Sequence, residues 1–168
     1  GQSWGLPQAA TYRGAKIILP GRYMAEDTAV LVDEMIAEGV TAANGAPAVF
    51  EPMLAYIETL SVKPDFSSTR LMSGATEPPL SMMRGFRDLT GADVVHGYGA
   101  TETTSVAVLN SIVKPSLRDR LSDEEQLDLK RCQGLPLNGV DVRIVDAEGN
   151  DLPHDGKSQG EILLRGPW

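Results

Sequence analysis

Residues 94–104 read Val-Val-His-Gly-Tyr-Gly-Ala-Thr-Glu-Thr-Thr, an apolar run that breaks into a glycine-rich loop. The apolar residues predict the end of a strand, and the two glycines let the backbone take a positive φ or approach a ligand closely. In open α/β sheets, ligands bind beyond the carboxyl ends of the strands, where this loop would lie. The stretch therefore predicts a strand followed by a ligand-binding loop.

Three side chains give this loop the chemistry of a nucleotide site. Tyr98 offers a flat ring for a purine, Thr101 offers a hydroxyl for a phosphate oxygen, and Glu102 offers a carboxylate. Mg²⁺ prefers such hard oxygen ligands and binds through few carboxylates plus substrate phosphates. An ordinary turn after a strand accounts for the same residues, so the choice between the two interpretations depends on the rest of the chain.

The chain before this loop alternates apolar runs with helical patterns. Strands are expected at 17–19, 40–43, 71–73 and 93–95, helices at about 28–38, 47–60 and 78–89, and a fifth strand at 103–109. Phe50 and Met53 fall on the apolar face of the second helix, which predicts that they belong to the core. This alternation predicts an α/β fold in which a parallel sheet is flanked by helices.

The last third of the chain has a different character. Ser122 and Glu125 form a capping box, which predicts a surface helix. Residues 140–145 and 161–165 alternate apolar and polar side chains around two turns, which predicts a small antiparallel β segment. We therefore divide the chain into an α/β subdomain with the binding loops (1–110), a helical connector (111–134) and a partial β subdomain (135–168).

Composition excludes several classes of function. The chain has 168 residues, a formal net charge of −8 and a pI near 4.7, which argues against nucleic-acid binding. It has no apolar stretch long enough for a transmembrane helix, and we expect no targeting leader. The single Cys132 fits a reducing compartment, so we expect a cytoplasmic protein, with peripheral association at a membrane left open. The sequence also lacks a Walker phosphate loop and a nucleophile elbow.

The order Gly-Tyr-Gly-x-Thr-Glu at 97–102 resembles a signature loop of the adenylate-forming (ANL) superfamily, which includes acyl-CoA synthetases, luciferases and peptide-synthetase adenylation domains. Trp-Gly-Leu-Pro at 4–7, Gly-Ala-Lys at 14–16 and Leu-Pro-Gly at 19–21 resemble the long-chain fatty-acyl-CoA synthetase (fatty-acid–CoA ligase) branch. The last third, with Gly-Lys-x-x-Gly-Glu-Ile-x-x-x-Gly-Pro, is similar to its small β subdomain. The likeness covers essentially the whole chain in order.

The resemblance implies that the chain is an internal piece of a large N-terminal AMP-binding domain. A phosphate loop with its lysine would lie upstream of Gly1. The ribose-binding aspartate, the hinge and the catalytic lysine would lie downstream of Trp168. The full enzyme would join a carboxylic acid to ATP, giving an acyl-adenylate and pyrophosphate, and would then transfer the acyl group to coenzyme A. The piece alone is expected to be inactive.

The resemblance also implies roles for particular residues. Thr101 would hydrogen-bond the α-phosphate, Glu102 would hold Mg²⁺, and Tyr98 would stack on the adenine of ATP or AMP. Further residues would line the nucleotide mainly through their backbone, namely Gly74, Ala75, His96, Gly97 and Gly99. The acyl tunnel would be bordered by Trp4, Gly45, Ala46 and Pro47.

Two residues depart from the family pattern. Ser73 replaces a usual glycine, and Glu77 stands where a neutral residue is commoner. One alternative is therefore another adenylate-forming enzyme, with an aryl or amino acid as substrate or a carrier-protein thiol as acceptor. An amino acid would need a buried carboxylate for its ammonium group, and Glu77, the only unusual acid near the pocket, is expected to be solvated. A non-catalytic α/β binding module is a further alternative, and homodimerisation of the full-length enzyme is left open.

Overall fold

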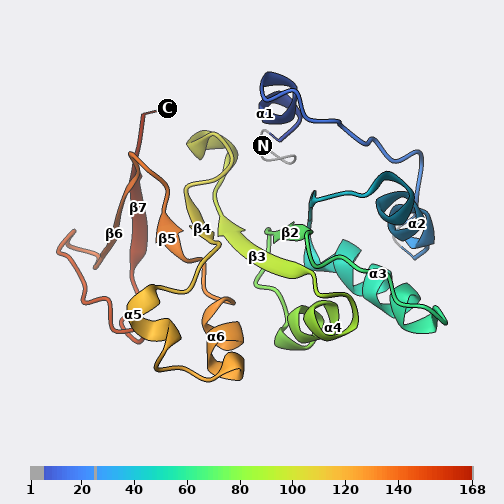
Figure 1. The fold of residues 1–168 in the computed structure, drawn as a ribbon. Coiled ribbons are helices and arrows are strands. Elements are labelled where there is room, and N and C mark those ends of the chain that lie inside the picture. The colour runs from blue at the N-terminus through green and yellow to red at the C-terminus, as the bar shows by residue number, and fades with distance from the viewer. Residues whose placement is uncertain (1–5, 25, 168) are drawn as a thin grey trace.

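The computed structural model describes residues 6–24 and 26–167, which form a five-stranded sheet and a separate two-stranded sheet (Figure 1). The larger sheet has the order β1-β2-β3-β4-β5, and β6 pairs with β7 in the smaller one. The strands are β1 (Ala42–Gly45), β2 (Arg70–Ser73), β3 (Asp93–Tyr98), β4 (Val108–Asn110), β5 (Leu135–Pro136), β6 (Asp141–Val145) and β7 (Glu161–Arg165).

Helices connect and cover these strands. They are α1 (Leu6–Tyr12), α2 (Ala29–Glu38), α3 (Pro47–Thr59), α4 (Leu80–Thr90), the short 3₁₀ helix η1 (Thr101–Thr103), α5 (Pro115–Arg118) and α6 (Asp123–Leu129). Helices α3, α4 and α6 lie below the sheet in the view of Figure 1. None of the helices in the described part of the chain is long and apolar enough to cross a membrane.

The first three strands run parallel, so their carboxyl ends share one edge of the sheet. The register places Gly45 beside Ser73 and Ser73 beside His96. Strands β4 and β5 are antiparallel to their neighbours, and Asn110 of β4 continues the row opposite His96. The predicted fold class, a mainly parallel sheet flanked by helices and followed by a small antiparallel β segment, is confirmed.

The core lies between the sheet and the helices. Phe50 and Met53 are each 2% exposed, so the prediction that they belong to the core is confirmed. The rings of Phe50 and Phe86 meet edge to face with their centroids 6.1 Å apart, a favourable arrangement for an aromatic pair. This contact joins α3 to α4 beneath the strands that carry the candidate site.

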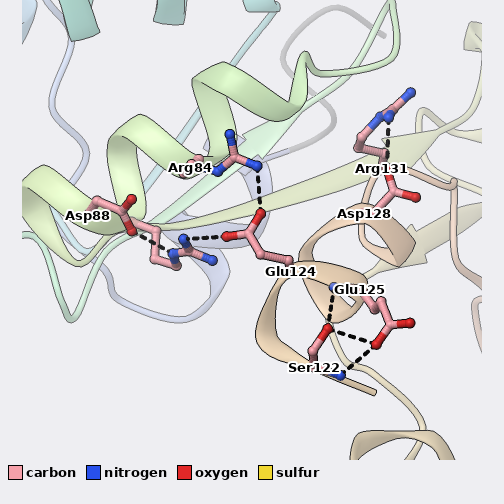
Figure 2. A network of polar contacts seen from close by, with 8 residues as sticks. Arg84, Asp88, Ser122, Glu124, Glu125, Asp128 and Arg131 are labelled. Carbon is pink, nitrogen blue, oxygen red and sulfur yellow. Dashed lines mark hydrogen bonds and ion pairs between the residues drawn. The ribbon is translucent and has the colours of Figure 1, made fainter.

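Ion pairs join α4 to α6, as Figure 2 shows. Glu124 accepts hydrogen bonds from Arg84 at 2.5 Å and from Arg87 at 3.0 Å. The capping box predicted at the start of α6 is confirmed, because the Ser122 hydroxyl accepts from the Glu125 N–H and Glu125 accepts from the Ser122 N–H. These contacts fix the position of α6 beside the sheet.

Two predicted strands are wrong. Residues 17–19 form no strand, and Leu19 is 78% exposed, because no described strand lies beside this apolar run to pair with it. The strand predicted at 103–109 begins only at Val108 and is antiparallel. Thr104 and Ser105 have φ values of 51° and 83°, which an extended strand cannot contain.

Candidate active site

The loop after β3 is closed on itself by hydrogen bonds around Ala100. The Thr103 hydroxyl accepts from the Ala100 N–H at 2.9 Å and donates to the Ala100 carbonyl at 3.0 Å. The Ser105 N–H donates to the same carbonyl at 3.1 Å, and the Ala107 N–H donates to the Tyr98 carbonyl at 2.9 Å. These hydrogen bonds within the loop hold its backbone in one shape.

Close backbone contact explains one glycine of the loop. A Cβ atom on Gly99 would lie 2.0 Å from the Ser105 carbonyl oxygen, so only glycine fits there. Thr104 and Ser105 follow with left-handed backbones, which cost free energy in residues other than glycine and cluster at functional sites. Gly99 thus serves the loop's own tight packing.

The three side chains with nucleotide chemistry differ in exposure. Thr101 and Glu102 are exposed, so their oxygens are available to a ligand. Tyr98 is half-buried and packs against the small cluster of Ala107, Val108 and Val140. The sequence therefore folds into a loop with a supported ring at its base and a hydroxyl and a carboxylate at its tip.

His96 lies just below this loop and is 3% exposed. Its Nδ1–H donates to the backbone carbonyl of Arg131, since a carbonyl can only accept. The imidazole is thus engaged with the segment that follows α6. Any contact between His96 and a nucleotide would use its backbone, as the resemblance implies, and that role stays a prediction.

The loop after β2 lies against the end of β1. The Gly74 N–H donates to the Gly45 carbonyl at 3.2 Å. Gly74 is buried, whereas Ala75 is exposed and has a φ of 73°, another left-handed residue at this edge of the sheet. The structure therefore places Gly74 and Ala75 at the same carboxyl edge of the sheet as the loop after β3.

Three of the four residues predicted for the acyl tunnel lie where β1 passes into α3. A Cβ on Gly45 would lie 3.3 Å from Cζ of Phe50, Ala46 is the N-cap of α3, and Pro47 is buried in its first turn. A groove of about 700 Å³ borders the neighbouring Asn44, with residues of α2, α3 and the segment 9–23. Gly45, Ala46 and Pro47 are not among the residues that line this groove, and Trp4 lies outside the described residues.

The structure places both departures from the family pattern. Ser73 is fully buried, and its hydroxyl has no hydrogen-bond partner among the described residues. Glu77 accepts two hydrogen bonds from the guanidinium of Arg131, one of them from Nε at 2.7 Å. The Glu77 carboxylate is therefore exposed and already paired, which argues against its serving as the counter-ion of a substrate ammonium group.

A metal at this site would depend on Glu102 and substrate oxygens. Across residues 6–24 and 26–167, no group of three or more histidine, cysteine, aspartate or glutamate side chains is placed to hold a metal ion. One exposed carboxylate fits Mg²⁺, which keeps several waters and commonly binds through one or two carboxylates plus phosphates. The donors present therefore fit an ion that arrives with a nucleotide.

Sequence reasoning missed Arg131 and Asn110. Asn110 is 6% exposed, and its side-chain N–H₂ donates to the carbonyls of Leu129 and Cys132 at 2.9 and 2.7 Å. Arg131 lies 35 positions from His96 of β3, and Asn110 of β4 lies 19 and 22 positions from Leu129 and Cys132. No periodic pattern or motif marks such contacts.

The described residues form an α/β domain in which the loop after β3 lies at the carboxyl edge of a mainly parallel sheet. A family model described as AMP-binding enzyme matches residues 3–168, so the chain belongs to the AMP-binding enzyme family. It is 42% identical to a long-chain-fatty-acid–CoA ligase of Thermus thermophilus and 39% identical to a medium-chain-fatty-acid–CoA ligase of Ectopseudomonas oleovorans. Both matches cover 99% of this chain but only 30% of the relative, so the chain spans about a third of these relatives.

Solved structures agree on the fold. A long-chain-fatty-acid–CoA ligase from Archaeoglobus fulgidus is 19% identical with a TM-score of 0.76, over 98% of this chain and 31% of that one. An anthranilate–CoA ligase in complex with anthranoyl-AMP is 23% identical with a TM-score of 0.68, over 91% of this chain and 26% of that one. At these identities the likeness concerns the fold alone.

Proposed function

We propose that the chain is part of a fatty-acid–CoA ligase, which activates a fatty acid with ATP and passes the acyl group to coenzyme A. The observation that carries the proposal is the closed loop after β3, which presents Thr101 and Glu102 to solvent in a chain 42% identical to a long-chain ligase. We also propose that the enzyme is cytoplasmic, because a single cysteine fits a reducing compartment.

The residues of this chain would act by positioning and by electrostatics. The Thr101 hydroxyl would donate a hydrogen bond to an oxygen of the α-phosphate, and the Tyr98 ring would stack on the adenine. Glu102 would hold Mg²⁺, which when bound neutralises charge on the phosphoryl oxygens. The carboxylate of the acid is itself the nucleophile, so the reaction needs no general base from these residues.

The pre-shaped loop supports this role in a further way. In-line attack on the α-phosphorus demands reacting atoms held close to their final geometry. Hydrogen bonds around Ala100 and the tight packing of Gly99 hold the loop from within. Binding a nucleotide would therefore cost little ordering of the chain.

Exchange of labelled pyrophosphate into ATP tests the proposal directly. The full-length protein, expressed with the flanking residues that its reading frame encodes, should catalyse exchange that depends on a fatty acid and on Mg²⁺. It should then form the CoA thioester when coenzyme A is added. Residues 1–168 alone should show no exchange above background, because the phosphate loop and the catalytic lysine implied by the resemblance lie outside them.

The same assay separates the alternatives. Exchange with benzoate-type acids or amino acids, but not with fatty acids, would assign a different acid. Transfer only to a carrier-protein thiol would assign a different acceptor. The absence of exchange with every acid tested would favour a binding module without chemistry and would overturn the proposal.

A further inference from the structure

Arg131 lies just after α6 and contacts strand β3 and the loop after β2. Its backbone carbonyl accepts the hydrogen bond from His96, the residue before Gly97 in the loop motif. Its guanidinium donates to Glu77, three residues after Gly74. Arg131 therefore contacts both strand β3, which leads into the Gly-Tyr-Gly loop, and the end of the loop after β2.

Asp128 also holds the guanidinium of Arg131. The Arg131 Nη1 donates to Asp128 at 2.8 Å, an i,i+3 pair at the end of α6 that Figure 2 shows. The Arg131 N–H donates to the Asp128 carbonyl at 3.1 Å. Asp128 therefore anchors the Arg131 side chain to the end of α6. The second carboxylate partner of the guanidinium, Glu77, belongs to the loop after β2.

The loop after β2 needs such an anchor. Ala75 has a φ of 73°, a left-handed backbone that persists only where the surroundings hold it in place. Gly74 is tied on one side of it by the hydrogen bond to the Gly45 carbonyl. Glu77 is tied on the other side by Arg131, so the strained residue lies between two fixed points.

We propose that Arg131 is a positioning residue for nucleotide binding, which holds the Gly74–Glu77 loop in register with the loop after β3 through its ion pair with Glu77. The proposal depends on the function proposed above, because it assigns the two loops to the same nucleotide. It also gives Glu77 a role as the partner that carries the effect of Arg131 to the loop.

The expected effect is on binding and is modest. The ion pair is exposed, and exposed pairs of this kind contribute little free energy each. If the binding-competent loop becomes less populated, the apparent affinity for ATP falls by the same fraction. Arg131→Gln and Glu77→Gln should therefore each raise the KM for ATP about two- to five-fold in the full-length protein, while kcat for exchange changes by less than about two-fold.

A control variant matches the change without touching the loop or Arg131. Arg84→Gln breaks an exposed ion pair between α4 and α6, where the Arg84 side chain is 46% exposed against 37% for Arg131. This control should leave the KM for ATP unchanged, and all three variants should show similar small shifts in Tm.

A double variant tests the mechanism. If Arg131 acts through Glu77, the Arg131→Gln, Glu77→Gln pair should raise the KM for ATP no further than either single change. An unchanged KM in both single variants, an additive double variant, or an equal KM shift in Arg84→Gln would overturn the proposal. The absence of exchange in the unaltered protein would instead overturn the proposed function, so the two failures are distinguishable.

Discussion

His96 and Asn110 lie opposite each other in the antiparallel pair of β3 and β4. Asn110 donates to the carbonyl of Leu129 at the end of α6, and His96 donates to the carbonyl of Arg131 just beyond it. The last carbonyls of a helix, such as that of Leu129, have no partner within the helix and need donors from elsewhere. The sheet supplies these donors from two side chains that are each buried. The strand below the candidate site and the segment that holds Glu77 are therefore parts of one hydrogen-bonded unit.

Substitution of Asn110 should lower the stability of the protein more than any other change in this hydrogen-bonded unit. Asn110→Asp would replace a donor to two carbonyls with a carboxylate that repels them in a buried position. We expect a loss of about 2–5 kcal/mol in the free energy of unfolding. Chemical denaturation measures this loss, with Asn138→Asp at an exposed position as the matched control. Equal losses of stability in the two variants would contradict a stabilising role for the hydrogen bonds of Asn110.

Gly99→Ala tests the packing of the loop after β3. The added methyl would lie 2.0 Å from the Ser105 carbonyl oxygen, so the loop must move, at a cost of about 1–3 kcal/mol. We also expect the KM for ATP to rise, because Thr101 and Glu102 follow directly. Gly21→Ala is the control, since a Cβ there meets no atom within 4 Å. If Gly99→Ala left both stability and KM unchanged, the tight contact would not matter.

Much of the fold could be predicted because local patterns carry it. The three parallel strands, the helix stop at Gly39, which has a φ of 60°, and the buried Phe50 all follow from periodicity and turn chemistry. The run at 17–19 misled because apolar residues predict a strand only where a neighbouring strand is available to pair with them. Local sequence does not show whether such a partner exists.

The candidate site divides in the same way. The Gly-Tyr-Gly-x-Thr-Glu order located the loop, and the structure adds that Thr101 and Glu102 are exposed. The contacts of Arg131 with His96 and Glu77 join positions 35 and 54 residues apart. They depend on how α6 packs against the sheet, and an arginine just after a charged helix otherwise looks like any solvated residue. The roles of the site residues toward a nucleotide stay predictions.

The link between α4 and α6 should weaken in acid. Hydrogen bonds from Arg84 and then Arg87 lower the pKa of Glu124 below its ordinary value of 4.5. A carboxyl whose pKa is lower in the folded state stabilises the fold above its unfolded pKa, and this contribution is lost as the pH falls through the folded value. The Tm difference between wild type and Glu124→Gln should therefore be constant from pH 7 to about 5 and shrink below about 4.5. Glu51→Gln, on an exposed part of α3, is the control, and a difference that grows in acid would contradict this sign.

Glu102→Gln separates a metal ligand from a structural residue. Glu102 is exposed, and no hydrogen bond or ion pair of its side chain is found within the described part of the chain, so neutralising it should leave Tm nearly unchanged. If it holds Mg²⁺ in the full-length protein, the variant should lose at least about tenfold in the rate of pyrophosphate exchange, which corresponds to about 1.4 kcal/mol.

The two half-reactions make that test specific. Pyrophosphate leaves only in the first step, where the metal offsets the developing charge, so transfer of the acyl group from a preformed acyl-adenylate to coenzyme A should suffer less. Raising the Mg²⁺ concentration should recover part of the exchange rate, because the remaining oxygen ligands still bind the ion weakly. Glu148→Gln, in the exposed turn after β6, is the matched control and should change neither step. Equal losses in both half-reactions, or a fall in Tm of several degrees, would show that Glu102 supports the loop and does not hold the metal.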